Sequence, residues 1–300
     1  MEQLKTFYKG KNVLVTGGAG FIGSHITQRL CSYKANVTVI DDLSTGCIDN
    51  LSTFCSDINF IARDVSSYKA CLKATKSQNI VFHTAAFISV TLSIKQPALC
   101  EKINVDGTYN LLEACKTNQV QTFIFSSSAS VYGNKKEKCH EDDSPRPQSP
   151  YANSKLKGET LCKEYAGKHK IKTASLRYFN VYGNRQSPHS EYAGVVAKFK
   201  HNLKNQKPII IYGDGKQKRD FIHVSDVVDA NLAIAMQQNL QGDVFNIATG
   251  TSITLLDMLK KLSTETKSKP IKILFKPARK GDIYCSVADC KKYIGIKGSF

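Results

Sequence analysis

Apolar and polar residues follow a regular rhythm through the first part of this 300-residue chain. Short runs rich in β-branched and aromatic side chains alternate with stretches in which apolar residues recur every three to four positions. Several runs are apolar throughout, which is typical of strands covered on both faces of a parallel sheet. The predicted strands are residues 12–16, 36–40, 59–62, 80–83, 122–125 and 173–179.

The stretches between these runs carry the spacing of amphipathic helices. Ile22, Ile26 and Leu30 illustrate it between the first two predicted strands. Strands that alternate with helices predict right-handed βαβ units. We therefore expect an α/β fold with a doubly wound parallel sheet.

The second half of the chain has longer loops and fewer strands. We expect residues 1–180 to form the main sheet domain. Residues 181–300 should form mainly a smaller, interleaved α/β domain, with some segments returning to the first sheet. The pattern predicts loops at 183–192 and 212–220, helices at 192–204 and 225–237, and a strand at 244–248.

Composition is ordinary for a globular protein, with 41% apolar and 22% charged residues. No apolar run approaches the ~20 residues needed to cross a bilayer, and the first residues lack the apolar centre of a secretion signal. Ten cysteines are scattered without CxxC spacing, which favours free thiols in a reducing compartment over a disulfide frame or a zinc site. We therefore expect a cytoplasmic protein with no metal and no membrane partner.

The formal net charge of +17 is the unusual number of the composition. One interpretation is binding of nucleic-acid phosphates, and the other is a lysine-rich solvated surface. Lysines are spread from Lys5 to Lys297, and no nucleic-acid-binding motif accompanies them. We therefore expect no nucleic-acid partner, although a positive surface could steer an anionic, diphosphate-bearing substrate.

A glycine-rich turn follows the first predicted strand. In VLVTGGAGFIGSHI (13–26), Gly17, Gly20 and Gly23 stand between a strand and a helix. Glycine is needed where backbone approaches a pyrophosphate closely, and the next helix offers free N–H groups to it. Glycines alone are a weak signal because they also end strands, but the strand–turn–helix context favours a dinucleotide site.

An acidic pair at the end of the second predicted strand supports this interpretation. Asp41 lies 18 residues after Gly23, where a carboxylate can bind both hydroxyl groups of a ribose. A carboxylate would repel a 2′-phosphate, which favours NAD over NADP. The alternative is that Asp41 and Asp42 are simple turn residues.

Two later stretches indicate a catalytic site. FSSSASVYG (125–133) ends an apolar run in three serines, and SPYANSK (149–155) places Tyr151 and Lys155 on one face of a helix. Tyrosine has a reference pKa of about 10, but a neighbouring ammonium and a cationic nicotinamide would favour the phenolate as a general base. The alternative is a polar turn and an ordinary surface pair.

Together these motifs resemble the extended short-chain dehydrogenase/reductase family, in its sugar-nucleotide epimerase/dehydratase branch. The resemblance implies a Rossmann domain that holds NAD tightly, a C-terminal domain that binds a nucleoside diphosphate sugar, and a homodimer formed by helices at 97–117 and 150–168. The matches cover nearly the whole chain in order. They are TGGAGFIGSH, VIDDLSTG, RDV, HTAA, NVDGT, SSSASVYG, SPYANSK, LRYFNVYG, YGDGKQKRDFIHVSDV, FNIATG and ARKGDIYCSVAD.

Roles carried over from the family, position by position, give three sets of residues. The implied catalytic trio is Ser128, Tyr151 and Lys155. The implied NAD-binding residues are Gly17, Gly20, Phe21, Ile22, Gly23, Asp41, Asp42, Asp64, Val65, Thr84, Ala85, Ala86, Asn104, Ser126, Tyr151, Lys155 and Tyr178, with Asn104 matched as a support of the active-site helix. The implied substrate-binding residues are Ser128, Tyr151, Asn180, Arg219, Arg279, Asp282 and Ser286, of which the arginines suit the diphosphate.

The two residues after Ser128 narrow the reaction that the resemblance implies. Several family members begin by oxidising carbon 4 of the sugar. The 4,6-dehydratases then use an Asp-Glu pair just before the Val-Tyr-Gly, and sugar-acid decarboxylases carry a Glu in the second position. Here these positions are Ala129 and Ser130, which cannot act as such acids or bases. A redox-neutral 4-epimerase remains.

Sugar specificity is also suggested by resemblance. RQSPHSEYAGVV (185–196) and HTAAFISV (83–90) look like the subgroup that handles UDP-hexoses, particularly N-acetylated ones. A bulky Tyr after the Arg-x-Gly-Asp segment crowds an N-acetyl group, and the aligned residue here is Ser286, unless it is only a strand residue near the pocket. We therefore expect interconversion of UDP-N-acetylglucosamine and UDP-N-acetylgalactosamine, with UDP-glucose and UDP-galactose as further candidates. The alternatives are a UDP-glucuronate 4-epimerase, a keto-sugar reductase or a non-catalytic nucleic-acid-binding member.

Overall fold

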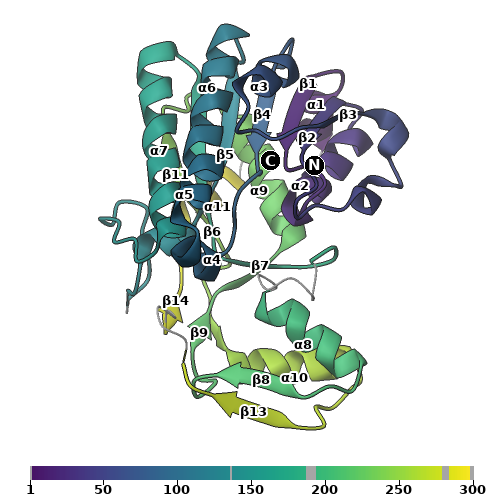
Figure 1. Ribbon diagram of the computed structural model, residues 1–300, viewed down its shortest axis with the longest axis vertical. Coiled ribbons are helices and arrows are strands. Elements are labelled where there is room, and N and C mark those ends of the chain that lie inside the picture. The colour runs from purple at the N-terminus through teal and green to yellow at the C-terminus, as the bar shows by residue number, and fades with distance from the viewer. Residues whose placement is uncertain (1, 136, 187–193, 279–283, 298–300) are drawn as a thin grey trace.

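The computed structural model describes residues 2–135, 137–186, 194–278 and 284–297. Its centre is a seven-stranded sheet in the order β3-β2-β1-β4-β5-β6-β11 (Figure 1). All neighbouring strands in this sheet are parallel, as the sequence predicts. The strands are β1 (Asn12–Thr16), β2 (Asn36–Asp41), β3 (Ile58–Ala62), β4 (Ile80–His83), β5 (Thr122–Ser128), β6 (Lys172–Tyr178) and β11 (Asp243–Ile247).

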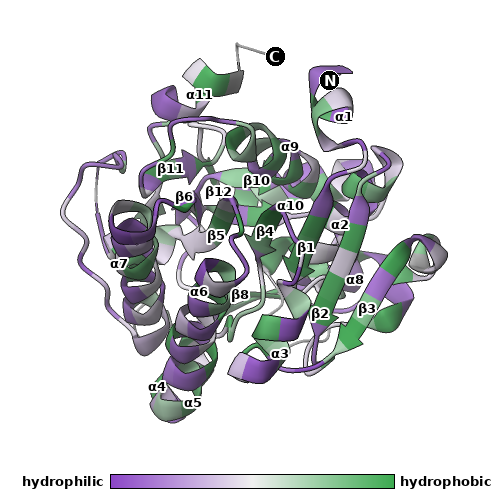
Figure 2. Cartoon of the chain, turned by 90° about the horizontal axis from the view of Figure 1, so that it is seen from above, coloured by the Kyte–Doolittle hydropathy of each residue, from purple (hydrophilic) through white to green (hydrophobic). Residues whose placement is uncertain are grey.

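Helices cover both faces of the sheet and enclose an apolar core on each side. Figure 2 shows the mainly apolar strands between the two helical layers. One layer contains α1 (Glu2–Tyr8), α2 (Phe21–Ser32), α9 (Val224–Ala235) and α11 (Lys291–Lys297). The other contains α3 (Tyr68–Ala74), α6 (Gly107–Thr117) and α7 (Pro150–His169). This is the doubly wound arrangement, which leaves the carboxyl ends of the strands open for a ligand.

The structure corrects the predicted boundaries at two places. β5 runs on to Ser128, three residues beyond its predicted end, because the serine backbones keep their pairing with β6. Paired backbone groups are satisfied whatever side chain they carry, so a polar run can still be strand. The loop predicted at 212–220 contains β9 (Lys218–Arg219), which pairs with β12 (Ile253–Thr254) and β14 (Cys285–Ser286).

A smaller lobe lies below the sheet in Figure 1. In it, α8 (Val195–Lys204) and α10 (Leu255–Glu265) share a core with the two-stranded sheet of β8 (Ile209–Tyr212) and β13 (Ile273–Lys276). The helix predicted at 192–204 is α8, although its first two predicted residues lie outside the described part.

Two short parallel strands connect this lobe with the main sheet. They are β7 (Asn180–Tyr182), which follows β6, and β10 (Phe221–His223), which leads into α9. The chain then returns through α9 and β11 to the first sheet, so residues beyond 180 contribute to both parts. Residues beyond 180 therefore complete the main sheet as well as building the lobe.

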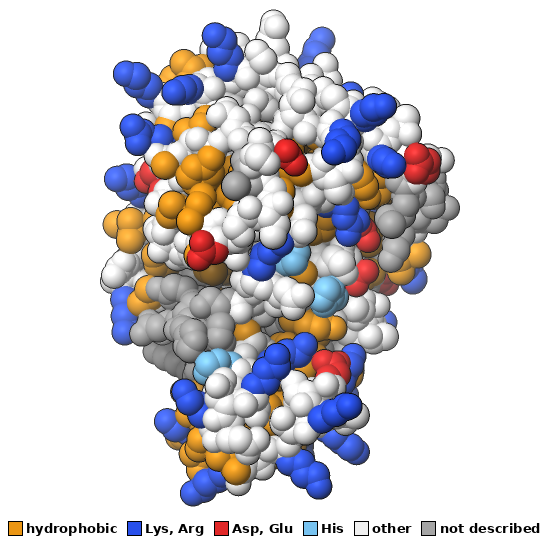
Figure 3. All heavy atoms as spheres, turned by 90° about the vertical axis from the view of Figure 1, so that its right-hand side faces the viewer, with side chains coloured by type: hydrophobic (Ala, Val, Ile, Leu, Met, Phe, Trp, Pro, Cys, Tyr) orange, Lys and Arg blue, Asp and Glu red, His pale blue; other side chains and the backbone are white. Residues whose placement is uncertain are grey.

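The surface has no dominant charged band in the face that Figure 3 presents, where lysine and arginine side chains are scattered. This agrees with a solvated lysine-rich surface. In the described ranges, no helix has the length and apolar character to cross a membrane, and no group of three or more side chains is arranged to hold a metal. The nine cysteines whose side chains are described are free thiols.

Candidate active site

The turn between β1 and α2 is built from glycines that leave no room for a side chain. Gly17 has a φ of +64°, and a Cβ atom there would lie 2.7 Å from the backbone nitrogen of Ala85. A Cβ on Gly23 would lie 2.2 Å from the carbonyl oxygen of Gly17 and 2.7 Å from Thr84 Oγ1. Gly20 precedes α2 and provides no side-chain cap. The first N–H groups of that helix are therefore available to an anionic ligand.

Asp41 ends β2 and links it to the glycine turn. Its Oδ2 accepts a hydrogen bond from the N–H of Ala19 at 2.9 Å, and its Oδ1 accepts one from Leu43 at 2.8 Å. Burial raises the pKa of the Asp41 carboxyl, and these two hydrogen bonds oppose the rise. Asp42 is exposed and accepts hydrogen bonds from the N–H and hydroxyl of Ser44. The turn interpretation therefore suits Asp42, whereas Asp41 also ties the end of β2 to the glycine turn.

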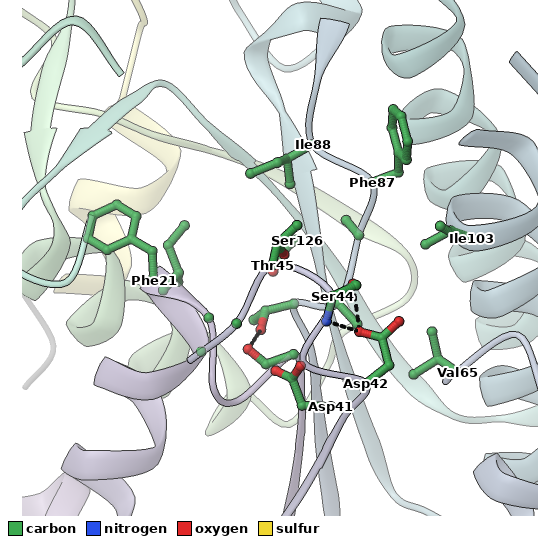
Figure 4. A pocket seen from close by; sticks show the side chains of 18 of the residues that line it. Phe21, Asp41, Asp42, Ser44, Thr45, Val65, Phe87, Ile88, Ile103 and Ser126 are labelled. Atoms are coloured by element: carbon green, nitrogen blue, oxygen red, sulfur yellow. Dashed lines mark hydrogen bonds between the residues drawn. The ribbon is translucent and has the colours of Figure 1, made fainter. Parts of the chain in front are cut away.

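One cavity runs along the carboxyl ends of the strands, and Figure 4 shows Asp41 and Asp42 near one end with Ser126, Phe87 and Ile88 further along. All the residues that the sequence assigns to NAD line it except Asn104. Sequence reasoning missed ten further lining residues, namely Ile40, Ser44, Thr45, Gly46, Arg63, Phe87, Ile88, Ser89, Ile103 and Ser127. Most of these residues end a predicted strand or follow one closely, so their proximity to a strand end could have identified them. Ile103 belongs to a helical segment, and no sequence pattern identified it.

The residues that line this cavity fit a dinucleotide. The backbone at Gly17 and Gly23 forms a surface that a Cβ atom would obstruct, beside the uncapped start of α2. Buried Asp41 and half-buried Asp64 stand at the ends of the neighbouring strands β2 and β3. A dinucleotide consists of two nucleosides joined by a pyrophosphate. A carboxylate at a strand end suits a ribose, and a helix N-terminus suits the pyrophosphate.

Asn104 lies behind the cavity wall. It belongs to a π-helical turn at Lys102–Asp106, between α5 (Pro97–Glu101) and α6. Its Oδ1 accepts a hydrogen bond from the N–H of Phe87 at 2.7 Å, and its Nδ2 donates to Ser154 Oγ at 2.8 Å. Asn104 therefore ties the loop after β4 to α7, which is a supporting position.

Ser128 and Tyr151 meet at the end of β5. Tyr151 stands in the first turn of α7, whose N-cap Ser149 accepts a hydrogen bond from Ala152 N at 3.1 Å. Burial raises the pKa of Tyr151, while a hydrogen bond with the Ser128 hydroxyl opposes the rise. Ser128 Oγ also accepts a hydrogen bond from Ser130 N at 3.2 Å. The Ser128 hydroxyl is thus a nearby polar group that counters the effect of burial on the pKa of Tyr151.

Lys155 completes the trio one turn later on α7. Its Nζ donates to the carbonyl oxygen of Ser126 at 2.8 Å and lies 5.9 Å from the centre of the Tyr151 ring. Burial lowers the pKa of Lys155 to about 8. From the sequence we expect this ammonium to favour the Tyr151 phenolate. In the protein alone, burial outweighs any such effect, because the pKa of Tyr151 is raised.

At the end of the cavity that holds Tyr151 and Lys155, the described lining contains no carboxylate. Ala129 and Ser130 begin a 3-10 turn, Ala129–Tyr132, that follows Ser128 directly. Within the described lining of the cavity, the carboxylates are Asp41, Asp42 and Asp64, all from the ends of β2 and β3. The tyrosine therefore has no carboxylate beside it on that wall to serve as a second acid or base.

Among the predicted substrate residues, Tyr151 lines this cavity, whereas Ser128, Asn180, Arg219 and Ser286 are not part of its lining. Arg219 and Ser286 face one another in register on β9 and β14, and Arg219 lines a second cavity together with Tyr182, Phe221, His223 and Lys261. Asn180 begins β7, and its Nδ2 donates to the carbonyl oxygen of Asp220 at 3.0 Å. Arg279 and Asp282 lie outside the described residues. The structure thus brings Arg219 and Ser286 together on one small sheet.

Comparison with known proteins gives one family. Residues 13–248 match the model of the NAD dependent epimerase/dehydratase family. The chain is 39% identical over 283 residues to a putative UDP-glucose 4-epimerase of Methanocaldococcus jannaschii, covering 93% of this chain and 90% of that relative. It is 31% identical over 273 residues to a UDP-N-acetyl-alpha-D-glucosaminuronate decarboxylase of Bacillus cytotoxicus, covering 88% and 84%.

Solved structures agree in fold. The UDP-N-acetylglucosamine 4-epimerase from Methanobrevibacter ruminantium, in complex with UDP-N-acetylmuramic acid, matches with a TM-score of 0.91 at 38% identity, covering 96% of this chain and 92% of that one. The Thermus thermophilus UDP-glucose 4-epimerase in complex with NAD matches with a TM-score of 0.87 at 34% identity, covering 95% and 92%. With the sheet order and glycine turn described above, these matches establish that the chain belongs to the NAD-dependent epimerase/dehydratase family and uses NAD as its cofactor.

Proposed function

We propose that this protein is a UDP-sugar 4-epimerase that interconverts UDP-N-acetylglucosamine and UDP-N-acetylgalactosamine. The observation that carries the proposal is the reaction end of the cavity. Tyr151 and Lys155 line that end and Ser128 ends the adjoining strand β5, while Ala129 and Ser130 stand where the family resemblance places carboxylates in a dehydratase or decarboxylase. Elimination of water needs such an acid and base, whereas inversion at carbon 4 returns every proton it removes.

The residues that would hold NAD follow from the cavity lining. The pyrophosphate would bind the glycine turn and the start of α2, with Asp41 toward the adenosine ribose and Asp64 toward the adenine. Tyr151 and Lys155 would stand at the nicotinamide end. When bound, NAD supplies the positively charged nicotinamide that accepts a hydride from carbon 4 and gives it back.

The protein's own part in the reaction is to move one proton at Tyr151. As a phenolate, Tyr151 removes the proton from the 4-hydroxyl group, and it returns that proton after the sugar has presented its other face. We assign the Ser128 hydroxyl, which counters the effect of burial on the pKa of Tyr151, to the substrate oxygen, because a hydroxyl can donate or accept a hydrogen bond there. Lys155 supplies a positive charge nearby, which favours the phenolate.

The preference for N-acetylated sugars rests on Ser286. This half-buried serine pairs in register with Arg219, the residue expected at the diphosphate. A serine in this position leaves more room for a sugar 2-substituent than a tyrosine would. The names of the two solved relatives, one acting on N-acetylglucosamine and one on glucose, keep both sugar classes among the candidates.

Incubation of the purified protein with UDP-N-acetylglucosamine, without added NAD, tests the proposal. We expect the 4-epimer as product and no net NADH, because the cofactor is retained and regenerated in each cycle. UDP-glucose, UDP-glucuronate and a reaction with NADPH are run in parallel. A released keto sugar, stoichiometric NADPH consumption or turnover of UDP-glucuronate alone would contradict it.

We also propose a homodimer built on the helices beside α7. Three large apolar side chains there are exposed in the monomer: Ile94 on α4 (Val90–Lys95) at 59%, Leu99 on α5 at 42% and Tyr109 on α6 at 49%. Large apolar side chains left exposed on the helices of one face are typical of a subunit interface. Light scattering should give a dimer for the native protein and a monomer for Leu99→Arg; a native monomer would contradict the proposal.

A further inference from the structure

A buried ion pair contacts the residues on both sides of Ser128 in the sequence. Arg177 on β6 donates to Glu159 on α7 through Nε at 2.9 Å and through Nη2 at 2.7 Å. The side chains are only 4% and 6% exposed, and neither residue lines the cavity. A buried pair is weak evidence for stability, because apolar residues of similar volume often serve as well. Its presence beside an active site therefore calls for another explanation.

The contacts of the pair bracket Ser128 on both sides. The hydroxyl of Ser127, the residue before it, donates to Glu159 Oε1 at 2.5 Å. The guanidinium of Arg177 lies 4.6 Å from the centre of the ring of Tyr132, which ends the 3-10 turn after Ser128. The ion pair therefore contacts the backbone segment before Ser128 through Ser127 and the segment after it through Tyr132.

The same helix holds the catalytic base. Glu159 lies one turn after Lys155 and two turns after Tyr151 on α7. Ser127 and Arg177 are partners in the register of β5 and β6, so the pair joins two strands to one helix. We propose that Glu159 and Arg177 are positioning residues, which lock the end of β5 to α7 and so fix the separation of Ser128 from Tyr151. The inference rests on the proposed epimerase function, where misplacement of a catalytic group is read as a lower kcat.

A second consequence concerns Lys155. Burial is the largest influence on its pKa and lowers it, while Cys100 on α5 and Cys162 and Glu159 on α7 oppose the effect. Of these three groups, Glu159 is the carboxylate. Removing this negative charge should therefore let Lys155 lose its proton at a lower pH. A merely structural ion pair would affect stability without moving a pH profile in this direction.

The Ser127→Ala variant removes the hydroxyl that donates to Glu159 and leaves the ion pair intact. Because Ser127 also lines the cavity, the amount of bound NAD is measured to separate an effect on the cofactor from an effect on position. Thr173→Ala is its matched control: Thr173 lies on β6 and donates to the carbonyl oxygen of Cys162 on α7 at 2.8 Å, away from the cavity. We expect kcat to fall about tenfold in Ser127→Ala, since a misplacement of about 1 Å can cost about a hundredfold. KM, bound NAD and melting temperature should match those of Thr173→Ala. Equal kcat values for the two variants would overturn the inference.

The Glu159→Gln variant tests the charge. It keeps an acceptor for Ser127, and we expect the alkaline limb of the kcat/KM profile to move to lower pH than in the native enzyme. An unmoved limb would overturn the electrostatic part. Where this variant does not fold, Glu159→Gln combined with Arg177→Gln removes the unpaired buried charge and carries the same expectation.

The positioning role can be tested even if the proposed epimerase function is wrong. If the native protein turned over no UDP-hexose, that function would be wrong, and crystal structures of Ser127→Ala and Thr173→Ala would decide the inference. We expect Ser128 Oγ to move away from Tyr151 by on the order of 0.5 Å in the first variant only, a displacement that matters in a catalytic site. An unchanged Ser128 position would refute the positioning role.

Discussion

The cavity that fits NAD and the second cavity, which Arg219 lines, are built by different kinds of strand. We call them the cofactor side and the sugar side. On the cofactor side, lining residues come from the ends of six parallel strands of one sheet, β1 to β6, and atoms approach so closely that a Cβ on Gly23 would meet Gly17 at 2.2 Å. On the sugar side, the described residues come from strands of two or three residues, such as those that carry Arg219 and Ser286. In a regular sheet, the positions of the residues at the strand ends are fixed by pairing along the whole strand. In strands of two or three residues, the positions depend on a few local pairs. The first side should therefore tolerate almost no change, and the second should allow specificity to be altered.

The glycine turn offers the most severe test of this contrast. We expect Gly23→Ala to abolish retention of NAD and all turnover, because the new Cβ would collide with backbone that cannot yield. The measurements are the NAD released on denaturation and the melting temperature. Gly167→Ala on α7 is the control, since nothing lies within 4 Å of its Cβ; it should keep its NAD and gain about 0.5–1 kcal/mol of stability. A Gly23→Ala enzyme with normal bound NAD would disprove the close-approach argument.

Loss of the proton carrier is the next largest effect. We expect Tyr151→Phe to lower kcat by about 10²–10⁴-fold while NAD stays bound, because general acid–base catalysis contributes an effect of that size. Epimerisation is followed by chromatography of the two UDP-sugars. The control is Tyr68→Phe, which removes a hydroxyl from an exposed tyrosine on α3 and should leave kcat unchanged. Near-native turnover by Tyr151→Phe would exclude this residue as the base.

The same contrast explains what could be read from the sequence. Apolar runs and glycines predict the strands and the cofactor turn because steric and burial requirements act on neighbouring residues. The extension of β5 through three serines escaped prediction, because it depends on pairing with β6 and not on the side chains themselves. The pairing of Glu159 with Arg177 escaped for a similar reason, since no local pattern joins a helix to a strand. Arg219 and Ser286 came from family resemblance alone, and only the structure reveals that their strands are neighbours.

Sugar specificity tests the tolerant side. We expect Ser286→Tyr to lower kcat/KM for UDP-N-acetylglucosamine by about 10–200-fold, the range that pocket volume can discriminate, and to change that for UDP-glucose only a few-fold. Ser286→Ala keeps the volume small and should preserve both activities. Measured kcat/KM values for the two sugars give the ratio. An equal loss with both would mean that Ser286 supports the strand and does not select the sugar.

The pH dependence of turnover gives the finest test of the cofactor side. Burial lowers the pKa of Lys155 from its ordinary 10.5 to about 8, so a rise in pH through that value removes the ammonium beside Tyr151. We expect kcat/KM to be about half its plateau value near pH 8 and to fall further above it, because this ratio reports the free enzyme. Lys155→Arg retains the charge, and its profile should lack that limb. The decline cannot come from unfolding through Lys155: its pKa is lower in the folded state, so the unfolded chain binds more protons between about pH 8 and 10 and the contribution of Lys155 to stability rises there with pH. An alkaline limb that persists unchanged in an active Lys155→Arg enzyme would assign the titration to another group.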